Sequence, residues 1–132
     1  MEKETRTMKV ASLKFSDKER PSFYGVTVDD QGNILYYNKK GELHRLDGPA
    51  IERWDGSKEW YVDGKPHRLD GPAVERPDGT KIWYVDGKPH RLDGPAIEMA
   101  NGLKFWYVDG KLISASEEDF EQWKKEHGYE NS

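Results

Sequence analysis

Apolar and polar residues alternate along most of this chain in short blocks, and the blocks recur with a period of 23 residues. The stretch from Trp60 to Ala73 recurs letter for letter from Trp83 to Ala96. Short runs rich in aromatic and β-branched residues, such as Lys81 to Val85, lie between Asp-Gly turn signals and predict β-strands. A fixed short period indicates a repeat architecture in which each unit packs on its neighbours.

The turns predict how one unit folds. A two-residue hairpin at Asp86-Gly87 would place His90 opposite Trp83, and a hairpin at Asp78-Gly79 would place Val74 opposite Trp83. Alternation along the strands then predicts two faces. One face carries Val74, Trp83, Val85 and His90, and the other carries Ala73, Ile82, Tyr84 and Arg91.

The third Asp-Gly of each unit is ambiguous. Asp70-Gly71-Pro72 is compatible with a tight turn or with a kink inside one long strand from Pro66 to Arg76. A kink is favoured, because two strands per unit keep successive repeats in the same direction and glycine followed by proline suits a bulge.

The predicted fold is mainly β: a single-layer antiparallel β-meander of 23-residue hairpin repeats with a C-terminal capping α-helix. The chain is expected to form a single domain over 1–132. An N-terminal segment covers 1–21, in which residues 1–7 are expected to fray and Lys9 to Phe15 to form a strand. Repeats cover 22–112, with one degenerate unit followed by three fuller units that start at His44, His67 and His90.

Residues 114–128 predict the helix. Ser116 is the expected N-cap, with Asp119 as an imperfect capping-box partner. Phe120 and Trp123 fall on one face and are expected to pack on the last hairpin, while Gly128 suits the C-terminal cap. A docking helix for a partner is the alternative interpretation.

The unit resembles the MORN repeat. The matching residues are Trp83-Tyr84, Asp86-Gly87-Lys88, His90, Gly94 and Asn101-Gly102. The chain departs from that pattern after the histidine, where Arg45, Arg68 and Arg91 begin the sequence Arg-Leu-Asp-Gly-Pro-Ala. This His-Arg-Leu-Asp-Gly-Pro-Ala variant is similar to repeat proteins of bacteriophages and giant viruses. The resemblance implies a β-hairpin array and a phage-type accessory protein that binds a bacterial host protein.

Composition limits the classes of function. The chain has 25 acidic and 21 basic residues, well mixed, so duplex nucleic acid is not an expected partner. It has no cysteine, which excludes disulfides and thiolate chemistry. No apolar run approaches the ~18 residues of a membrane span, and the expected localisation is the cytoplasm, that of the host if the protein is phage-encoded.

The repeated histidines and aspartates suggest a metal site at first. Two strands per repeat would, however, place equivalent histidines ~10 Å apart, too far to share one ion. Acid–base catalysis is not favoured, because an active site is usually a single constellation rather than a repeated surface. We therefore expect no metal, no cofactor and no enzymatic activity. The residues expected to be structural are His44, His67, His90, Asp47, Asp70, Asp93, Trp60, Trp83 and Trp106.

A row of arginines beside tyrosines is the candidate binding surface, because this composition is typical of binding hot spots. The alternative is that each arginine pairs with a nearby carboxylate on a solvated face. The candidate residues are Arg45, Arg68, Arg91, Tyr61, Tyr84, Tyr107 and Trp123.

The sequence thus predicts a binding module whose partner is a bacterial host protein, such as a component of host defence, which it would inhibit. Self-association as a homodimer is also expected, because a thin sheet exposes aromatic surface. The alternative is a nucleotide-signal binding protein that uses the arginine–tyrosine row. A membrane-surface binder is a weaker alternative, since an acidic chain suits anionic lipids poorly.

Overall fold

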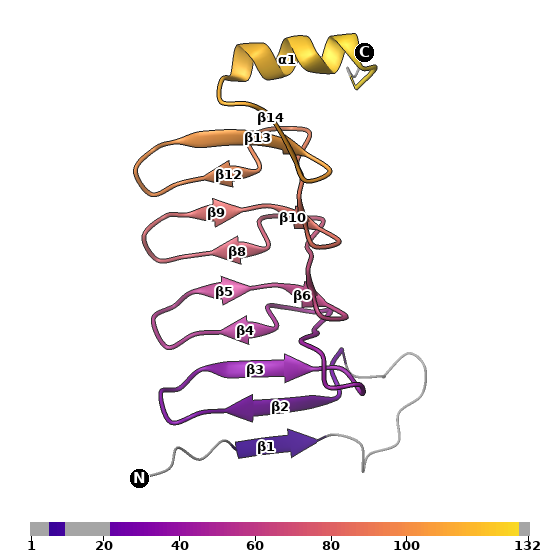
Figure 1. Cartoon of the computed structure of the whole chain (residues 1–132). Helices are drawn as coiled ribbons and strands as arrows, with labels where there is room; N and C mark the ends of the chain where they lie inside the picture. The colour runs from indigo at the N-terminus through magenta and orange to yellow at the C-terminus, as the bar shows by residue number, and fades with distance from the viewer. Residues whose placement is uncertain (1–5, 10–21, 130–132) are drawn as a thin grey trace.

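The computed structural model describes residues 6–9 and 22–129, and it shows an elongated stack of antiparallel strands with one helix at the C-terminal end (Figure 1). The strands are β1 (Arg6–Lys9), β2 (Gly25–Val28), β3 (Ile34–Tyr37), β4 (Ile51–Glu52), β5 (Lys58–Glu59), β6 (Tyr61–Val62), β7 (Lys65–Pro66), β8 (Val74–Glu75), β9 (Lys81–Ile82), β10 (Tyr84–Val85), β11 (Lys88–Pro89), β12 (Ile97–Glu98), β13 (Lys104–Val108) and β14 (Lys111–Ser114). The helix α1 spans Glu117–Glu126.

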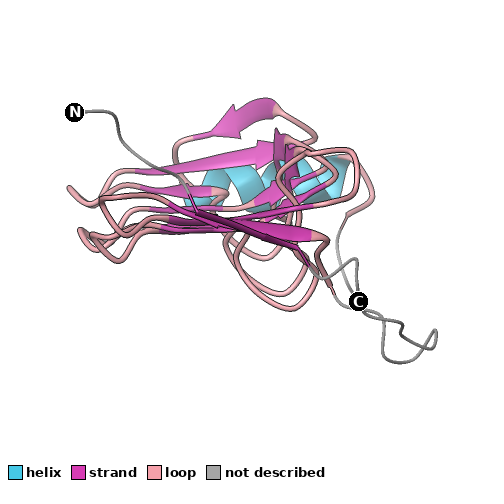
Figure 2. Cartoon of the chain, turned by 90° about the horizontal axis from the view of Figure 1, so that it is seen from below, coloured by secondary structure: helices cyan, strands magenta, loops and turns pink. Residues whose placement is uncertain are grey.

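Ten of these strands form one antiparallel sheet in the order β1-β2-β3-β4-β5-β8-β9-β12-β13-β14. Counted from its first strand in this sheet to the alanine that ends its loop, as in 51–73 and 74–96, each fuller repeat contributes two strands, so successive repeats run in the same direction. The predicted fold class, a mainly β antiparallel meander with a C-terminal helix, is confirmed. Viewed along the stack, the strands of the large sheet lie in a thin layer (Figure 2).

Two pairs of strands leave the large sheet and form side hairpins, β6–β7 and β10–β11. The predicted continuous strand from Lys81 to Val85 is therefore wrong, because it divides at Trp83 into β9 and β10. The Trp83 N–H donates to the Ala96 carbonyl of the large sheet (2.7 Å), and the Trp83 carbonyl accepts from the His90 N–H of the side hairpin (3.0 Å). Trp83 thus connects the large sheet to the side hairpin.

The turns fix two different registers. At Asp86-Gly87 the two-residue hairpin is as predicted, with Tyr84 opposite Pro89 and positive φ at both turn residues (51° and 82°). At Asp78-Gly79 the turn has one residue more, because the Arg76 N–H donates to the Thr80 carbonyl across Pro77, Asp78 and Gly79.

The longer turn changes the pairing. Val74 lies opposite Ile82 rather than opposite Trp83. Because a one-residue shift reverses the side-chain direction, Val74 and Ile82 share a face, and the predicted assignment of these two residues to opposite faces is wrong.

The predicted long strand from Pro66 to Arg76 is also absent. The chain instead forms a loop over 67–73 between β7 and β8, and the equivalent loops cover 44–50 and 90–96. We call these three segments the repeat loops. Each ends in an alanine that is fully buried, Ala50, Ala73 or Ala96, so the loop begins on the surface and ends in the sheet.

At the N-terminus, β1 pairs with β2, so Arg6 and Thr7 belong to the sheet rather than to a frayed end. The predicted strand over 9–15 lies, apart from Lys9, outside the described residues. The degenerate first unit adds β2 and β3, which pair with each other along four residues.

A cluster of buried apolar residues lies under the helix. Trp106 and Val108 of β13 pack against Phe120, which is completely buried, and Ile113 and Trp123 border them. Phe120 and Trp123 therefore pack on the last hairpin, as predicted. Within the described residues, no helix has the length and apolarity needed to cross a membrane.

The helix begins as predicted. Ser116 Oγ accepts a hydrogen bond from the Asp119 N–H (3.2 Å), three acidic residues occupy the first turn, and Lys124 and Lys125 occupy the last. Acidic residues at the first turn and basic residues at the last both favour the helix dipole. Gly128 follows with φ 77°.

Replacing Ser116 with alanine is expected to lower the free energy of unfolding by ~1 kcal/mol, because one N–H of the first helical turn loses its partner. Urea denaturation followed by circular dichroism measures this loss. Ser116→Asp is the matched control, because an aspartate also caps a helix and should keep most of the stability. Equal losses for both variants would contradict the capping role.

Candidate functional site

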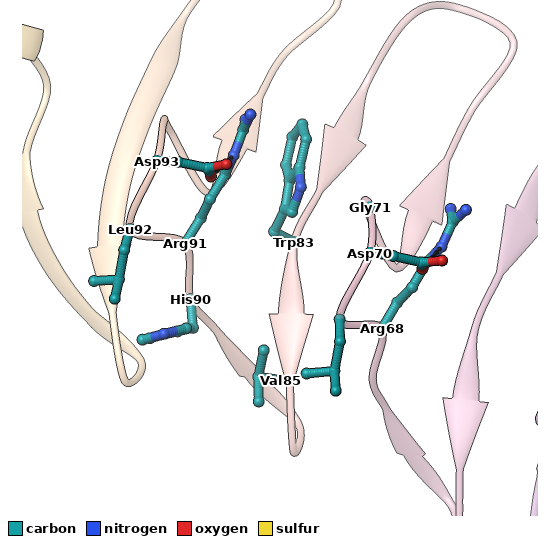
Figure 3. Close-up of a pocket in the computed structure, with 10 residues that line it drawn as sticks. Arg68, Asp70, Gly71, Trp83, Val85, His90, Arg91, Leu92 and Asp93 are labelled. Atoms are coloured by element: carbon teal, nitrogen blue, oxygen red, sulfur yellow. Dashed lines mark hydrogen bonds and ion pairs between the residues drawn. The ribbon is translucent and has the colours of Figure 1, made fainter. Parts of the chain in front are cut away.

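The predicted arginine row is present, but each guanidinium lies over an aromatic ring of its own repeat. Arg68 Cζ is 3.8 Å from the centroid of the Trp60 ring, and Arg91 Cζ is 3.8 Å from that of Trp83, as Figure 3 shows for the second pair. Arg45 lies 4.1 Å from the centroid of Tyr36. The predicted face that groups Arg91 with Tyr84, apart from Trp83, is therefore wrong.

Hydrogen bonds use most of each arginine's remaining capacity. Arg68 Nε donates to Asp70 (3.1 Å), and its Nη1 donates to the Pro72 carbonyl (3.0 Å) and to Glu75 (2.8 Å). Arg91 makes the same three bonds with Asp93, Pro95 and Glu98. The Arg68 side chain retains 23% of its exposure. These arginines hold the repeat loops through Nε and Nη1, so these two nitrogens are not available to a phosphate group.

The glycine of each repeat loop is needed for close approach. A Cβ added at Gly71 would lie 3.0 Å from Arg68 Cζ, and one at Gly94 would lie 2.7 Å from Arg91 Cζ. These glycines lack the positive φ that Gly79 and Gly87 adopt in the hairpin turns. Asp-Gly thus has two different uses in one repeat.

The repeated histidines connect neighbouring units. The Nδ1 atom of each accepts a hydrogen bond of 3.0 Å from the backbone N–H of an aspartate in the turn of the next two-residue hairpin along the chain. The pairs are His44 with Asp63, His67 with Asp86 and His90 with Asp109. This geometry supports the structural interpretation of the histidines. Among the described residues, no three His, Asp or Glu side chains are placed to hold a metal ion.

The loop aspartates are mostly exposed although each accepts a bond from its arginine. The side-chain exposure is 66% for Asp47 and 87% for Asp70 and for Asp93. The pKa of Asp47 is lowered, first by a hydrogen bond from Ser22 Oγ and then by Arg45. The three carboxylates form a regular negative row.

The candidate aromatic residues are divided between two regions. The three tyrosines, Tyr61, Tyr84 and Tyr107, are partly buried. Their backbone carbonyls accept hydrogen bonds from the backbone N–H groups of Arg45, Arg68 and Arg91, in that order. Burial, followed by the nearby Glu59, raises the pKa of Tyr61. Trp123 lies at the far end, stacked with Phe120, His127 and Tyr129, so the structure does not join it to the loops.

Sequence reasoning missed a set of exposed apolar residues that recurs in the repeat loops. Leu46, Leu69 and Leu92, which we call the leucine row, occupy the same position in the three repeat loops and are 67%, 80% and 37% exposed. The signal was present: a leucine recurs in a loop motif where no strand requires it. Lys124 Nζ donates to the Leu92 carbonyl (3.0 Å), so α1 meets the row at its C-terminal end.

Two equivalent hollows, open to solvent, lie between successive repeat loops, and each has a volume of about 600 Å³. Leu46 and Leu69 border the first, together with Trp60, Val62 and His67. The second, drawn in Figure 3, has Leu69 and Leu92 with Trp83, Val85 and His90. Leu69 belongs to both hollows. The arrangement can hold apolar groups at a regular interval.

Compared with models of known protein families, with curated proteins and with solved structures, the chain matches none. The resemblance to the MORN repeat therefore stays a prediction from the motif.

Proposed function

We propose that this chain is a non-enzymatic binding module that recognises a protein partner through the leucine row. The observation that carries the proposal is the exposure of one leucine at the same place in every repeat loop, up to 80% at Leu69. Regularly placed apolar side chains on a surface are typical of interaction sites.

The rigidity of the loops supports this proposal. Each leucine follows an arginine that is held by three partners and by an aromatic ring, as described for Arg68 and Arg91. Presenting a side chain from a fixed loop avoids most of the entropy lost when flexible loops become ordered on binding. Repetition along the stack favours an elongated contact over a single catalytic constellation.

The identity of the partner rests on the repeat motif. Because His-Arg-Leu-Asp-Gly-Pro-Ala is similar to repeats of bacteriophage proteins, we propose a bacterial host protein, such as a defence component, as the partner. The chain would then act as an inhibitor in the host cytoplasm. The nucleotide alternative depends on free arginines, and their hydrogen bonds to the loops make it the less favoured function.

The test is capture from a bacterial lysate, followed by calorimetry with the captured protein. Replacing Leu46, Leu69 and Leu92 together with aspartate is expected to weaken binding at least ~100-fold, because an apolar contact is lost at each loop and a carboxylate cannot replace it in an apolar contact. Unchanged far-UV circular dichroism checks that the variant is folded.

Leu103→Asp is the matched control. Leu103 is 54% exposed but lies in the turn between β12 and β13, outside both hollows. It should bind like the unmodified protein. Equal capture by the unmodified chain and by the triple variant would remove the leucine row as the binding surface.

A further inference from the structure

The two hollows between the repeat loops define an interval. Each repeat adds two strands to the large sheet, and neighbouring strands lie ~4.7–4.9 Å apart, so equivalent points recur every ~9.4–9.8 Å. The leucine row, with three members, therefore extends over ~19 Å. An occupant that uses both hollows must present similar groups at this interval.

The lining of the hollows specifies the chemistry of those groups. Trp83 and Val85, at the start of the side hairpin, line the second hollow, and so do Leu69 and Leu92 of two successive repeat loops. The Trp83 ring is closed on one side by Arg91, which has its own partners. The apolar part of the lining is aromatic and aliphatic, which suits compact apolar side chains, and charged side chains border it.

The charges along the hollows select the flanking residues of the occupant. Asp70 and Asp93 border the second hollow with 87% of each side chain exposed, and Asp47 occupies the same place at the first. The cationic side chains beside them, Arg68 and Arg91, are already bonded to carboxylates and carbonyls. The exposed aspartate oxygens can accept further hydrogen bonds, so the occupant should carry lysine or arginine.

The interval distinguishes between peptide conformations. A polyproline II helix has three residues per turn and a rise of ~3.1 Å, so side chains on one face recur every ~9.3 Å. An α-helix repeats a face after seven residues, ~10.5 Å, and its diameter of ~10–12 Å is wide for a hollow between loops. A β-strand repeats a face every ~6.6 Å. Over the two intervals of the leucine row, the polyproline II repeat differs from the expected leucine spacing by less than ~1 Å, whereas the α-helical repeat differs from it by ~1.5–2 Å.

We infer that the occupant of the leucine row is an extended polyproline II segment of the partner, with apolar residues at every third position and basic residues beside them. This inference rests on the proposed function and names the partner's chemistry. Aromatic-lined grooves are a general way to recognise such segments, because polyproline II is already ordered before binding. The two neighbouring hollows would bind side chains from two successive turns of the polyproline II segment.

The test uses synthetic fluorescent peptides and the full chain. The first peptide has leucine at every third position in a proline background, with lysine at both ends. The second has the same number of leucines placed at alternate positions, with the remaining prolines at its two ends, and the third is an alanine-rich helix with leucine at every seventh position. A fourth replaces the lysines of the first with glutamate. Fluorescence anisotropy is expected to show the first peptide binding at least ~10-fold more tightly than each of the others.

Variants of the chain locate the site. Leu69→Asp, which alters both hollows, is expected to weaken binding of the first peptide by at least ~10-fold, whereas Leu103→Asp should leave it unchanged. Equal binding of the first and second peptides, or of the first and third, would overturn the spacing argument. Equal binding of the fourth would overturn the charge argument.

The outcomes also separate this inference from the proposed function. If no peptide binds but lysate capture still depends on the leucine row, the polyproline II occupant is wrong and the binding module stands. If capture is also independent of the leucines, both fail.

Discussion

Replacing Phe120 with alanine is expected to lower the free energy of unfolding by ~3–5 kcal/mol, the typical cost of removing a fully buried phenylalanine. Phe120 has no exposed surface and lies 6.3 Å from the Trp106 ring and 6.1 Å from the Trp123 ring, measured between centroids. The loss should be large here because the large sheet is a thin layer, so few neighbouring side chains can move to fill the cavity left by the ring.

Urea denaturation monitored by tryptophan fluorescence measures the effect, since Trp106 and Trp123 report on the same cluster. Leu112→Ala is the control, because Leu112 also lies at this end of the stack but is 56% exposed, and it should change stability by less than ~0.5 kcal/mol. A loss below ~1 kcal/mol for Phe120→Ala would mean that the helix contributes little to the folded state.

Replacing Arg68 with alanine is expected to destabilise the chain by ~2–4 kcal/mol. The substitution removes three hydrogen bonds and the contact with the Trp60 ring, and it leaves the partly buried Glu75 without its cation. Arg68→Lys should recover only part of the loss, because lysine has no planar fork to donate to a carboxylate and a carbonyl at once.

Chemical denaturation of both variants measures these differences. Arg76→Ala is the matched control, since Arg76 lies in the exposed hairpin turn that follows the same repeat loop, and it should stay within ~0.5 kcal/mol of the unmodified protein. If Arg68→Ala and Arg76→Ala have the same effect, the arginines do not hold the repeat loops.

Much of the fold could be predicted because the period of 23 residues fixes how many strands each repeat adds. Local rules also succeeded where one residue controls the geometry: Asp86-Gly87 forms the expected two-residue turn and Ser116 caps the helix. These features depend on neighbours in the sequence. A short window of residues therefore contains the necessary information.

The features that could not be predicted depend on contacts between distant groups. Trp83 divides a run of β-forming residues because its N–H bonds to the Ala96 carbonyl of the large sheet and its carbonyl accepts from the His90 N–H of the side hairpin. The turn at Gly79 has one more residue than expected, which reverses the side-chain directions in the strand that follows it. A sequence pattern does not show which distant group each backbone atom bonds.

The candidate site shows the same division. The arginines were predicted as a repeated row, but their contacts differ from the predicted ones, and the leucines beside them were not predicted. Arg68 turns toward its own Trp60, which leaves the neighbouring Leu69 exposed. Whether an arginine faces solvent or an aromatic ring depends on a glycine at position 71, whose missing side chain makes room for the guanidinium.

The histidine bonds between adjacent units have a consequence for how such a chain can change its length. Each of these bonds joins one unit only to the next, as His67 does with the backbone of Asp86. Duplicating one whole unit would therefore create a new junction of the same kind and leave the capping helix and the first strands undisturbed. Recombination between near-identical repeats of the gene could then lengthen or shorten the array by whole units. The length of the repeat surface would evolve independently of the two ends of the chain.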